Sequence, residues 1–522
     1  MRWWCPAAMI LLALGAWAWL RAAETGYGEF IAALILILTV FGLGFWYIFL
    51  TGLRWRTRFL LTGAAVAAIA SIVLGLWKYT RIDGSIGGSG LPRLAWKWSP
   101  PRDAAAGALV VAFKPAAMDA IGNVSFPQFL GPDRSGIVHG VTLERDWSIS
   151  PPRELWRRPV GVGWSAFAVS GGRAITQEQR GEQELTVAYD LATGNPVWAH
   201  TNRVRFREAS GGDGPRATPT VRDGKVYVMG ATGILDCLDE NTGNRVWTRD
   251  VLREYNLQNI IWGKSCSPLL VGRLVVVTGG KEREKSLLAF AAENGEPVWQ
   301  SGRDCASYSS AAVATLGGQP QILIVNGHSV TGHHPADGRI LWEYPWPGNE
   351  AKVAQPLPLE PNLVLVATGY GIGGSLLRIE PAAAEQWTVT ELWKNRNLKP
   401  KFSSPVRRGN YVYGLDDGIL VCLDWLTGKR VWKEGKYGYG QILLVEDVLL
   451  IQSEAGDVVL AEAAPDGHRE LARLPALPSK TWNNPVLAGD LLLVRNDLEA
   501  ACYRLPLATG GASTRPAANA SH

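Results

Sequence analysis

The sequence predicts an all-β propeller of four-stranded antiparallel blades, preceded by an α-helical membrane anchor. Three observations lead to this fold class. A short phrase that ends in tryptophan recurs along most of the 522-residue chain, apolar runs separate its copies, and three long uncharged apolar runs come before the first copy. The 58 glycines and 23 tryptophans suit a protein built from many short strands and tight turns.

The recurring phrase is clearest at Cys237–Trp247 and at Cys422–Trp432. Its copies end at residues 156, 198, 247, 299, 342, 393, 432 and about 471, a period of about 39 to 52 residues that is typical of propeller blades. In each copy an apolar strand leads to a turn in which Gly supplies a positive φ angle, and a second strand then ends on Trp. We expect the Trp to fill the space between adjacent sheets. Unrelated hairpins with a common turn would not keep this spacing.

The two ends of the repeat region predict how the ring closes. Trp156 ends a strand that has no blade of its own before it, and Trp482–Leu505 supplies three strands without a fourth that ends in Trp. Pairing the two in one blade mixes N- and C-terminal strands and removes the free sheet edges.

Residues 1–81 are predicted to form a membrane anchor with transmembrane helices at about 3–20, 30–53 and 59–77, each long enough to cross a hydrocarbon layer of about 30 Å. A cleaved signal peptide would explain the first run alone. Arg54, Arg56 and Arg58 between the second and third runs predict a cytoplasmic loop, so the N-terminus is cytoplasmic and the propeller lies in the periplasm of a bacterial inner-membrane protein. The spans carry no acidic, basic or histidine side chain, which favours an anchor over a transport path; a quinone site between the helices stays open.

The remaining organisation follows from composition. Residues 82–125 are predicted to be a linker, Gly/Ser-rich at first, residues 126–508 the propeller, and residues 509–522 a disordered tail. The formal charge of +5 gives no reason to propose nucleic acid as a partner.

The six cysteines predict no haem attachment site and no zinc ribbon, because no Cys-x-x-Cys occurs. Cys237, Cys422 and Cys502 share one register of the repeat, so they should lie too far apart for disulfides and are expected to be buried apolar residues. Whether Cys266 and Cys305 form a bridge stays open.

The segment Phe126–Gly136, with Asp83-Gly84 and Leu91–Trp98 before it, resembles membrane-anchored bacterial proteins of the PQQ-like (pyrrolo-quinoline quinone repeat) β-propeller family. The Thr-Gly-x-x-x-Trp phrases are similar to repeats shared by quinoprotein dehydrogenases and the propeller lipoprotein of the outer-membrane assembly machinery. The resemblance implies eight blades, and the eight phrase ends agree. It is specific for the fold and weak for activity, because the family contains both enzymes and scaffolds.

The innermost strands of such a propeller line its central channel, and several segments taken as these strands begin with a cation or an aromatic residue. If the register holds, these side chains ring one mouth of the channel, which would suit an anionic, planar or sugar-like ligand. Solvated loop residues at strand entrances are the alternative. The candidate ligand-binding residues are Trp164, Arg216, Lys264, Tyr308, Lys401, Phe402, Lys480, Trp482 and Asn483.

No catalytic or metal-binding residue is assigned from the sequence. The resemblance to alcohol-oxidising quinoproteins would imply two adjacent cysteines and a set of oxygen ligands for Ca²⁺; this chain has no adjacent cysteines, and the oxygen set cannot be placed. His333 and His334 fall in an outer turn phrase and are expected at the surface.

Two functions remain. The first is a binding or scaffolding module in the cell envelope, whose partner is an anionic small molecule, a glycan or an envelope protein. The alternative is a PQQ-dependent dehydrogenase with Ca²⁺ or Mg²⁺ that oxidises an alcohol or aldose and passes electrons to membrane quinone. A sensor that signals inward is disfavoured because the predicted cytoplasmic parts are too short for an output domain.

Overall fold

The computed structural model describes residues 4–508 except 23–27, 51–53, 88–90, 101, 103–105, 108, 110–123, 282–283, 360 and 384–385. The predicted disordered tail and much of the predicted linker therefore lie outside the described residues. The chain forms two compact units, one of residues 1–100 with 209–212 and one of residues 101–208 and 213–522.

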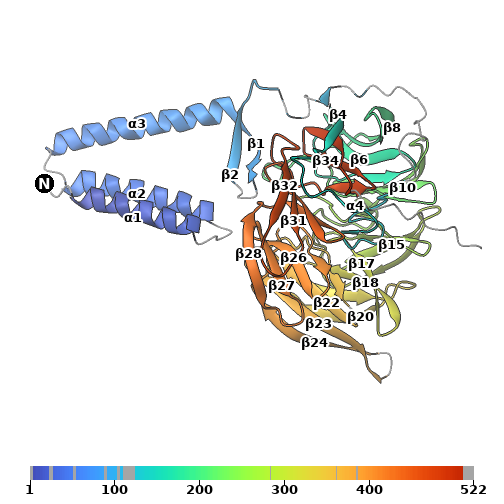
Figure 1. Cartoon of the computed structure of the whole chain (residues 1–522). Coiled ribbons are helices and arrows are strands. Elements are labelled where there is room, and N and C mark those ends of the chain that lie inside the picture. Colours follow the sequence, from blue (N-terminus) through green and yellow to red (C-terminus); the bar gives the residue numbers. More distant parts are fainter. Residues whose placement is uncertain are drawn as a thin grey trace, which may run out of the picture. The chain divides into compact units, whose positions relative to one another are not determined.

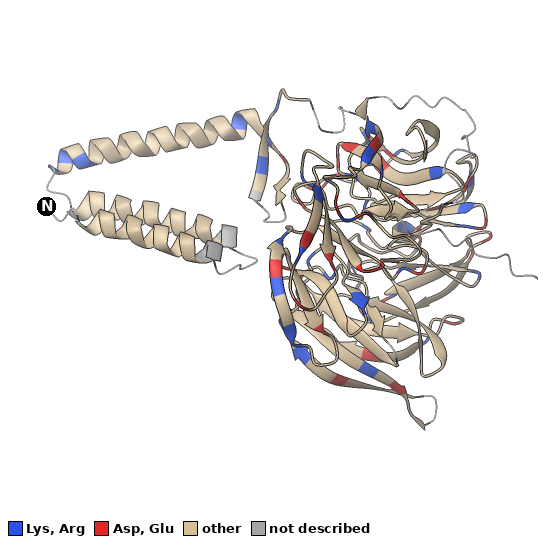
Figure 2. Cartoon of the chain, in the orientation of Figure 1, with Lys and Arg blue, Asp and Glu red and all other residues tan. Residues whose placement is uncertain are grey.

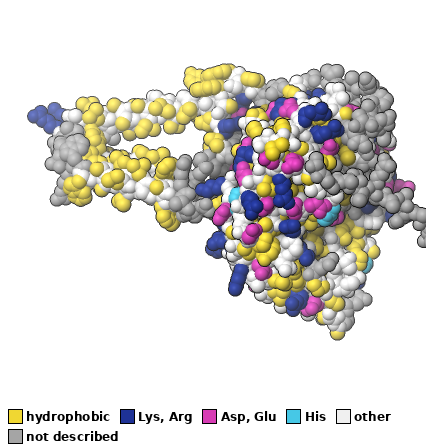
Figure 3. Space-filling model, in the orientation of Figure 1, with side chains coloured by type: hydrophobic (Ala, Val, Ile, Leu, Met, Phe, Trp, Pro, Cys, Tyr) yellow, Lys and Arg dark blue, Asp and Glu magenta, His cyan; other side chains and the backbone are white. Residues whose placement is uncertain are grey.

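The first unit contains three helices and a hairpin: α1 (Trp4–Ala22), α2 (Gly28–Leu50), α3 (Trp55–Tyr79), β1 (Thr80–Ile86) and β2 (Leu91–Trp96) (Figure 1). By length and composition, Ile31–Phe49 and Trp55–Tyr79 could each cross a membrane, whereas α1 contributes the shorter apolar stretch Trp4–Trp19. Hydrophobic side chains cover these helices (Figure 3). Basic residues of α3 are confined to its two ends, with Lys78 in the last turn (Figure 2).

The hairpin β1–β2 occupies a region that the sequence predicted to be irregular. The strands pair antiparallel from Thr80 opposite Trp96 to Ile86 opposite Leu91, with an irregularity between Ile82 and Ser85. An ion pair of 2.9 Å between Arg93 of β2 and Asp83 of β1 also joins the two strands of the hairpin. The Gly/Ser composition suggested loop, but it is concentrated at residues 87–90, which connect the two strands.

The second unit contains eight four-stranded antiparallel blades in its described residues, as predicted (Figure 1). In chain order, and from the innermost strand outward, the strands are β5 (Ala168–Ser170), β6 (Arg173–Arg180), β7 (Gln183–Asp190), β8 (Pro196–Asn202); β9 (Thr220–Arg222), β10 (Lys225–Met229), β11 (Ile234–Asp239), β12 (Arg245–Asp250); β13 (Leu269–Val271), β14 (Leu274–Thr278), β15 (Leu287–Ala291), β16 (Pro297–Ser301); β17 (Ala312–Leu316), β18 (Gln319–Val325), β19 (Ser329–His333), β20 (Ile340–Pro345); β21 (Leu357–Leu359), β22 (Leu363–Thr368), β23 (Gly373–Pro381), β24 (Trp387–Asn395); β25 (Val406–Arg408), β26 (Tyr411–Asp416), β27 (Ile419–Asp424), β28 (Arg430–Lys436); β29 (Gln441–Val445), β30 (Val448–Gln452), β31 (Val458–Glu462), β32 (Glu470–Leu474); and β33 (Val486–Ala488), β34 (Leu491–Arg495), β35 (Glu499–Arg504), β4 (Arg153–Pro159). A short helix, α4 (Val251–Glu254), follows β12.

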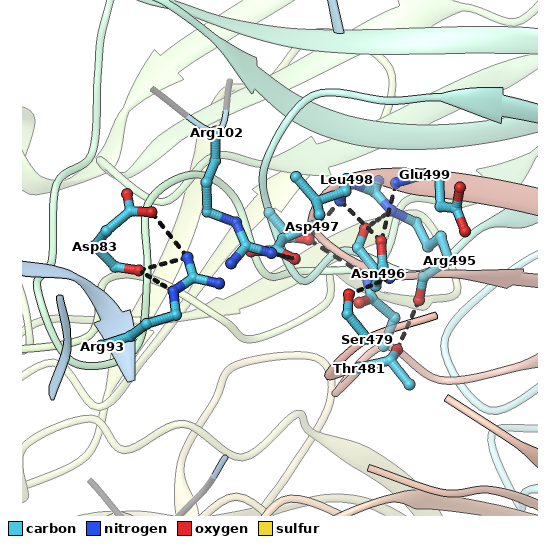
Figure 4. A network of polar contacts seen from close by, with 12 residues as sticks. Asp83, Arg93, Arg102, Ser479, Thr481, Arg495, Asn496, Asp497, Leu498 and Glu499 are labelled. Carbon is cyan, nitrogen blue, oxygen red and sulfur yellow. Dashed lines mark hydrogen bonds and ion pairs between the residues drawn. The ribbon is translucent and has the colours of Figure 1, made fainter. Parts of the chain in front are cut away.

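The last blade confirms the predicted closure of the ring. Strand β4 pairs with β35 and places Trp156 opposite Cys502. Arg495 of β34 is 1% exposed and ties this blade to the first one, because its guanidinium donates to Thr176 Oγ1 at 2.7 Å and to the Gln177 carbonyl at 2.9 Å. Next to it, Arg102 donates to Asp497 at 2.6 Å (Figure 4). Closure therefore uses both strand pairing and a buried polar network.

The recurring Trp locks each of several blades to the next. Its indole N–H donates to a carbonyl in the turn of the following blade, and in every copy named below except Trp432 its ring lies against the Gly of that turn. A Cβ at Gly243 would fall 2.4 Å from the Trp198 ring, so this Gly is required both by its φ of 70° and by the close approach. The hydrogen bonds are Trp156 to Leu191 (2.9 Å), Trp198 to Glu240 (2.9 Å), Trp247 to Ala292 (3.1 Å), Trp299 to Pro335 (3.1 Å), Trp393 to Trp425 (3.0 Å) and Trp432 to Ala464 (3.0 Å).

Trp342 departs from this pattern and donates to Gln321 Oε1 of its own blade at 2.7 Å. The connection between β23 and β24 of the next blade contains no glycine, unlike the turns that the other recurring tryptophans contact, and these two strands are the longest of their sheet.

Residues 126–138, here called the crossing segment, run across the inner strands of several blades. Phe126 forms a bridge with Val169 of β5, and Arg134 donates to the carbonyls of Ser267 and Pro268, which precede β13. The segment ends as β3 (Ile137–Val138), which pairs in parallel with β29. One continuous stretch thus connects blades that are far apart in the sequence.

Candidate ligand site at one mouth of the propeller

The segments predicted to be innermost strands instead lie just before those strands. Proline explains the difference, because Pro219, Pro268, Pro405 and Pro485 lack the N–H that a ladder needs, and strands β9, β13, β25 and β33 each begin at the following residue. All inner strands run in one direction along the channel axis. The segments before them therefore lie at one mouth of the channel.

Five of the nine predicted residues form one group at this mouth. The Trp482 ring lies 4.8 Å from the ring of Trp164 and 4.8 Å from that of Phe402, measured between centroids. Lys480 Nζ lies 4.0 Å from the Trp482 ring centroid. Lys401 Nζ lies 5.6 Å from that of Phe402. We call these residues, together with Tyr370, Tyr439 and Glu454 described next, the mouth cluster.

Three members of the mouth cluster were missed by sequence reasoning. Lys401 Nζ lies 4.2 Å from the Tyr439 ring and 4.9 Å from the Tyr370 ring, so aromatic faces surround the ammonium group. Glu454 accepts from Trp482 Nε1 at 2.8 Å and from the Tyr439 backbone N–H at 3.2 Å. Burial lowers the pKa of Lys401, and the Glu454 charge partly opposes this effect. Tyr439 could have been found because it lies two residues before β29, at the mouth end of its blade.

Arg216 and Tyr308 belong to a second group with Phe206 and Trp262. The Arg216 guanidinium lies 4.8 Å from the Phe206 ring, and the Trp262 and Tyr308 rings lie 5.3 Å apart. Tyr308 Oη accepts from the Trp262 backbone N–H at 3.2 Å. Burial lowers the pKa of Arg216 to about 10 and raises that of Tyr308.

The structure brings Lys264 and Asn483 into neither group. Lys264 is 0% exposed, and its Nζ donates to the Thr278 carbonyl at 2.6 Å and to Thr278 Oγ1 at 2.8 Å. Asn483 is 1% exposed and donates to the Ser165 carbonyl at 2.8 Å. Both side chains form hydrogen bonds within or between blades. The spacing of residues in the sequence does not specify whether a side chain points toward such partners or toward the channel mouth.

The two adjacent histidines and the six cysteines differ in their surroundings. His333 is buried rather than on the surface, and burial lowers its pKa to about 4. His334 pairs with Asp337 in the turn. None of the six cysteines, all of which lie in the described part of the chain, forms a disulfide, so Cys266 and Cys305 are not bridged, and those of the shared register are buried.

The mouth cluster can bind a ring by stacking and an anionic group through two ammonium groups. It does not fit the ligand set of a calcium-assisted PQQ site. Ca²⁺ takes six to eight oxygen ligands, whereas the one carboxylate identified in this cluster, Glu454, already accepts two hydrogen bonds.

A PQQ-repeat family profile, described as outer membrane protein assembly factor BamB, matches residues 148–281 and 255–434. The chain belongs to the PQQ-like β-propeller family. Within this family it is 24% identical over 380 residues to BamB of Shewanella oneidensis, which covers 67% of this chain and 88% of that protein. It is 30% identical over 146 residues to the quinohemoprotein alcohol dehydrogenase ADH-IIG of Pseudomonas putida, covering 27% of this chain and 19% of the dehydrogenase.

Among solved structures, a europium-containing methanol dehydrogenase is similar with a TM-score of 0.54 and 12% identity, over 73% of this chain and 91% of that one. At this level of identity the likeness shows the propeller fold alone. The PQQ-like family thus includes relatives named for assembly and relatives named for alcohol oxidation.

Proposed function

We propose that this PQQ-like propeller is a binding or scaffolding module of the bacterial cell envelope, with the mouth cluster as its ligand site. The observation that carries the proposal is the packing of Lys401 and Lys480 against aromatic rings at one mouth. The likeness to BamB over most of that protein supports a role in the envelope rather than in the cytoplasm.

The proposed location is the inner membrane, with the propeller in the periplasm. The apolar helices α2 and α3 support an anchor, and α1 would complete a three-span arrangement. Arg54, Arg56 and Arg58 would keep the α2–α3 connection in the cytoplasm. Residues after α3 would then lie on the far side.

The proposed ligand carries an anionic group beside a planar or sugar-like ring. Trp164, Phe402 and Trp482 offer adjacent aromatic surfaces, which stack on planar rings or on the apolar faces of sugars. Lys401 and Lys480 supply positive charge next to these surfaces. Such a ring could belong to a free small molecule, a glycan or a side chain of an envelope protein.

The test titrates the full chain in detergent with an oligoglucuronide and with a neutral glucose oligomer, and follows tryptophan fluorescence. We expect saturable quenching by the anionic saccharide alone, lost in the double variant Lys401→Met, Lys480→Met. The exposed Lys429 in an outer turn provides the control Lys429→Met. No saturable signal, or equal binding by the double variant, would reject the mouth cluster as a site for this ligand class.

The relationship to an alcohol dehydrogenase favours PQQ-dependent oxidation as the second candidate. It is tested by titrating the same preparation with PQQ and Ca²⁺, then measuring dye reduction with alcohols and aldoses. Micromolar binding with substrate-dependent reduction would replace the scaffold proposal. Absence of PQQ binding would reject the dehydrogenase as a candidate function.

A further inference from the structure

Three side chains that the mouth cluster does not use meet where the third blade (β13–β16) connects to the fourth (β17–β20). Asp304 and Cys305 follow strand β16, and His328 lies in the turn between β18 and β19. Cys305 Sγ lies 3.7 Å from His328 Nδ1, which in turn lies 3.1 Å from Asp304 Oδ1. The three atoms all lie within 4.8 Å of one another.

These distances match the edges of a tetrahedral zinc site. Bonds of about 2.3 Å to sulfur and about 2.0–2.2 Å to nitrogen and oxygen place neighbouring ligand atoms about 3.4–3.6 Å apart. The measured separations of 3.7 and 3.1 Å bracket that range. Thiolate, imidazole and carboxylate are also the ligand types that zinc takes in proteins.

Outer contacts hold the Asp304 carboxylate in place. Its Oδ2 accepts from the His328 backbone N–H at 2.6 Å and from Ser329 Oγ at 2.8 Å. Its Oδ1 accepts from the Cys305 backbone N–H at 2.8 Å. The carboxylate is therefore fixed before any ion arrives, which lowers the entropic cost of binding.

The His328 ring is oriented in the way that metal-binding histidines usually are. Its Nε2 lies 3.1 Å from Asn349 Oδ1, an acceptor that places a proton on Nε2. The lone pair of Nδ1 then faces a carboxylate oxygen and a sulfur. A cation between the three atoms would accept this lone pair, as the Cys305 thiol proton also can.

We infer that Asp304, Cys305 and His328 bind one Zn²⁺ ion, with its fourth position open to water or to a donor atom of a ligand. Three protein ligands with an open position distinguish such a site from a closed structural zinc site. Cys305 lies three residues before Tyr308 in the same segment, so the ion would lie beside the propeller mouth. The inference stands independently of the proposed saccharide site.

The test uses the full chain, reduced and stripped with a chelator, and titrated with Zn²⁺ by calorimetry and with Co²⁺ by absorbance. We expect one Zn²⁺ per chain and a thiolate-to-cobalt charge-transfer band. Cys305→Ser should abolish the band. Asn349→Ala should weaken Zn²⁺ binding about 10–100-fold, and Cys305→Ser should weaken it further.

Cys266→Ser is the matched control, because Cys266 is a free, buried thiol outside this cluster. It should leave both readouts unchanged. If Cys305→Ser does not fold, as judged by circular dichroism, His328→Gln tests the same site through the turn residue. No saturable Zn²⁺ binding in the wild type, or binding unchanged by the folded ligand variant, would overturn the inference.

Discussion

The indole Nε1 of Trp247 donates a 3.1 Å hydrogen bond to the carbonyl oxygen of Ala292 in the next blade. The same ring packs against Gly295 of that blade's turn. A sequence repeat thus encodes a contact between repeats, since the last residue of one phrase recognises the turn of the following one.

Replacing Trp247 should destabilise the propeller in two distinguishable steps. Trp247→Phe keeps most of the apolar contact and loses the hydrogen bond, for about 1 kcal/mol. Trp247→Ala also leaves a cavity, for about 3–5 kcal/mol. Denaturant unfolding followed by circular dichroism measures both, with the neighbouring exposed residue in Val246→Ala as control. Equal effects of the Ala and control variants would contradict the proposed role.

Gly295→Ala should cost more than Gly272→Ala. Both glycines have positive φ angles, 73° and 55°, so both substitutions carry backbone strain. A Cβ at Gly295 would lie 2.6 Å from the Trp247 ring, whereas nothing lies within 4 Å at Gly272. The difference between the two melting temperatures therefore measures the effect of the clash between the added Cβ and the Trp247 ring. Similar losses would mean that the ring can shift without cost.

Two lysines predicted for the same role should respond in opposite ways. Lys264→Met should destabilise the fold by about 1–3 kcal/mol, because the Thr278 carbonyl loses its buried donor. Lys401→Met should leave the melting temperature nearly unchanged and weaken anionic saccharide binding. Thermal unfolding and fluorescence titration on both variants separate these effects. A binding defect in Lys264→Met alone would contradict the proposal that Lys401 binds the ligand and Lys264 stabilises the fold.

Glu184 should make stability fall as the pH rises. Burial raises its pKa from 4.5 to about 7, and the Ala231 backbone N–H donates to it at 3.0 Å. The favourable contribution is fully present below pH 4.5 and is lost as the pH rises through 7, because the unfolded chain releases its proton first. Glu184→Gln keeps a hydrogen-bond acceptor but has no proton to lose. Between pH 4.5 and pH 8 its free energy of unfolding should therefore rise by up to about 3 kcal/mol relative to that of the wild type. Parallel pH profiles of unfolding for both proteins would contradict this.

The parts of the fold that repeat locally could be predicted from the sequence. The Thr-Gly turns, the blade count and the pairing of β4 with β35 all follow from one phrase and its spacing. The hairpin β1–β2 could not be, because a Gly/Ser connection dominated the composition of its region.

The candidate site was predictable only in part. A cation or an aromatic residue shortly before a proline marks a strand entrance in the sequence, and this local pattern identified Lys401, Phe402, Lys480 and Trp482. Tyr439 lies two residues before β29, but no proline marks that strand entrance. Lys264 has the pattern but turns inward, because Thr278 offers it buried acceptors.

The pairing of β4 with β35 gives this molecule a high contact order. Trp156 meets Cys502 only after nearly the whole propeller has been synthesised, and until then β4 has no partner. Loop-closure entropy must be overcome across that length before the last blade exists, which predicts slow and cooperative folding. Removal of β35 should consequently open the ring at both ends rather than delete a single strand.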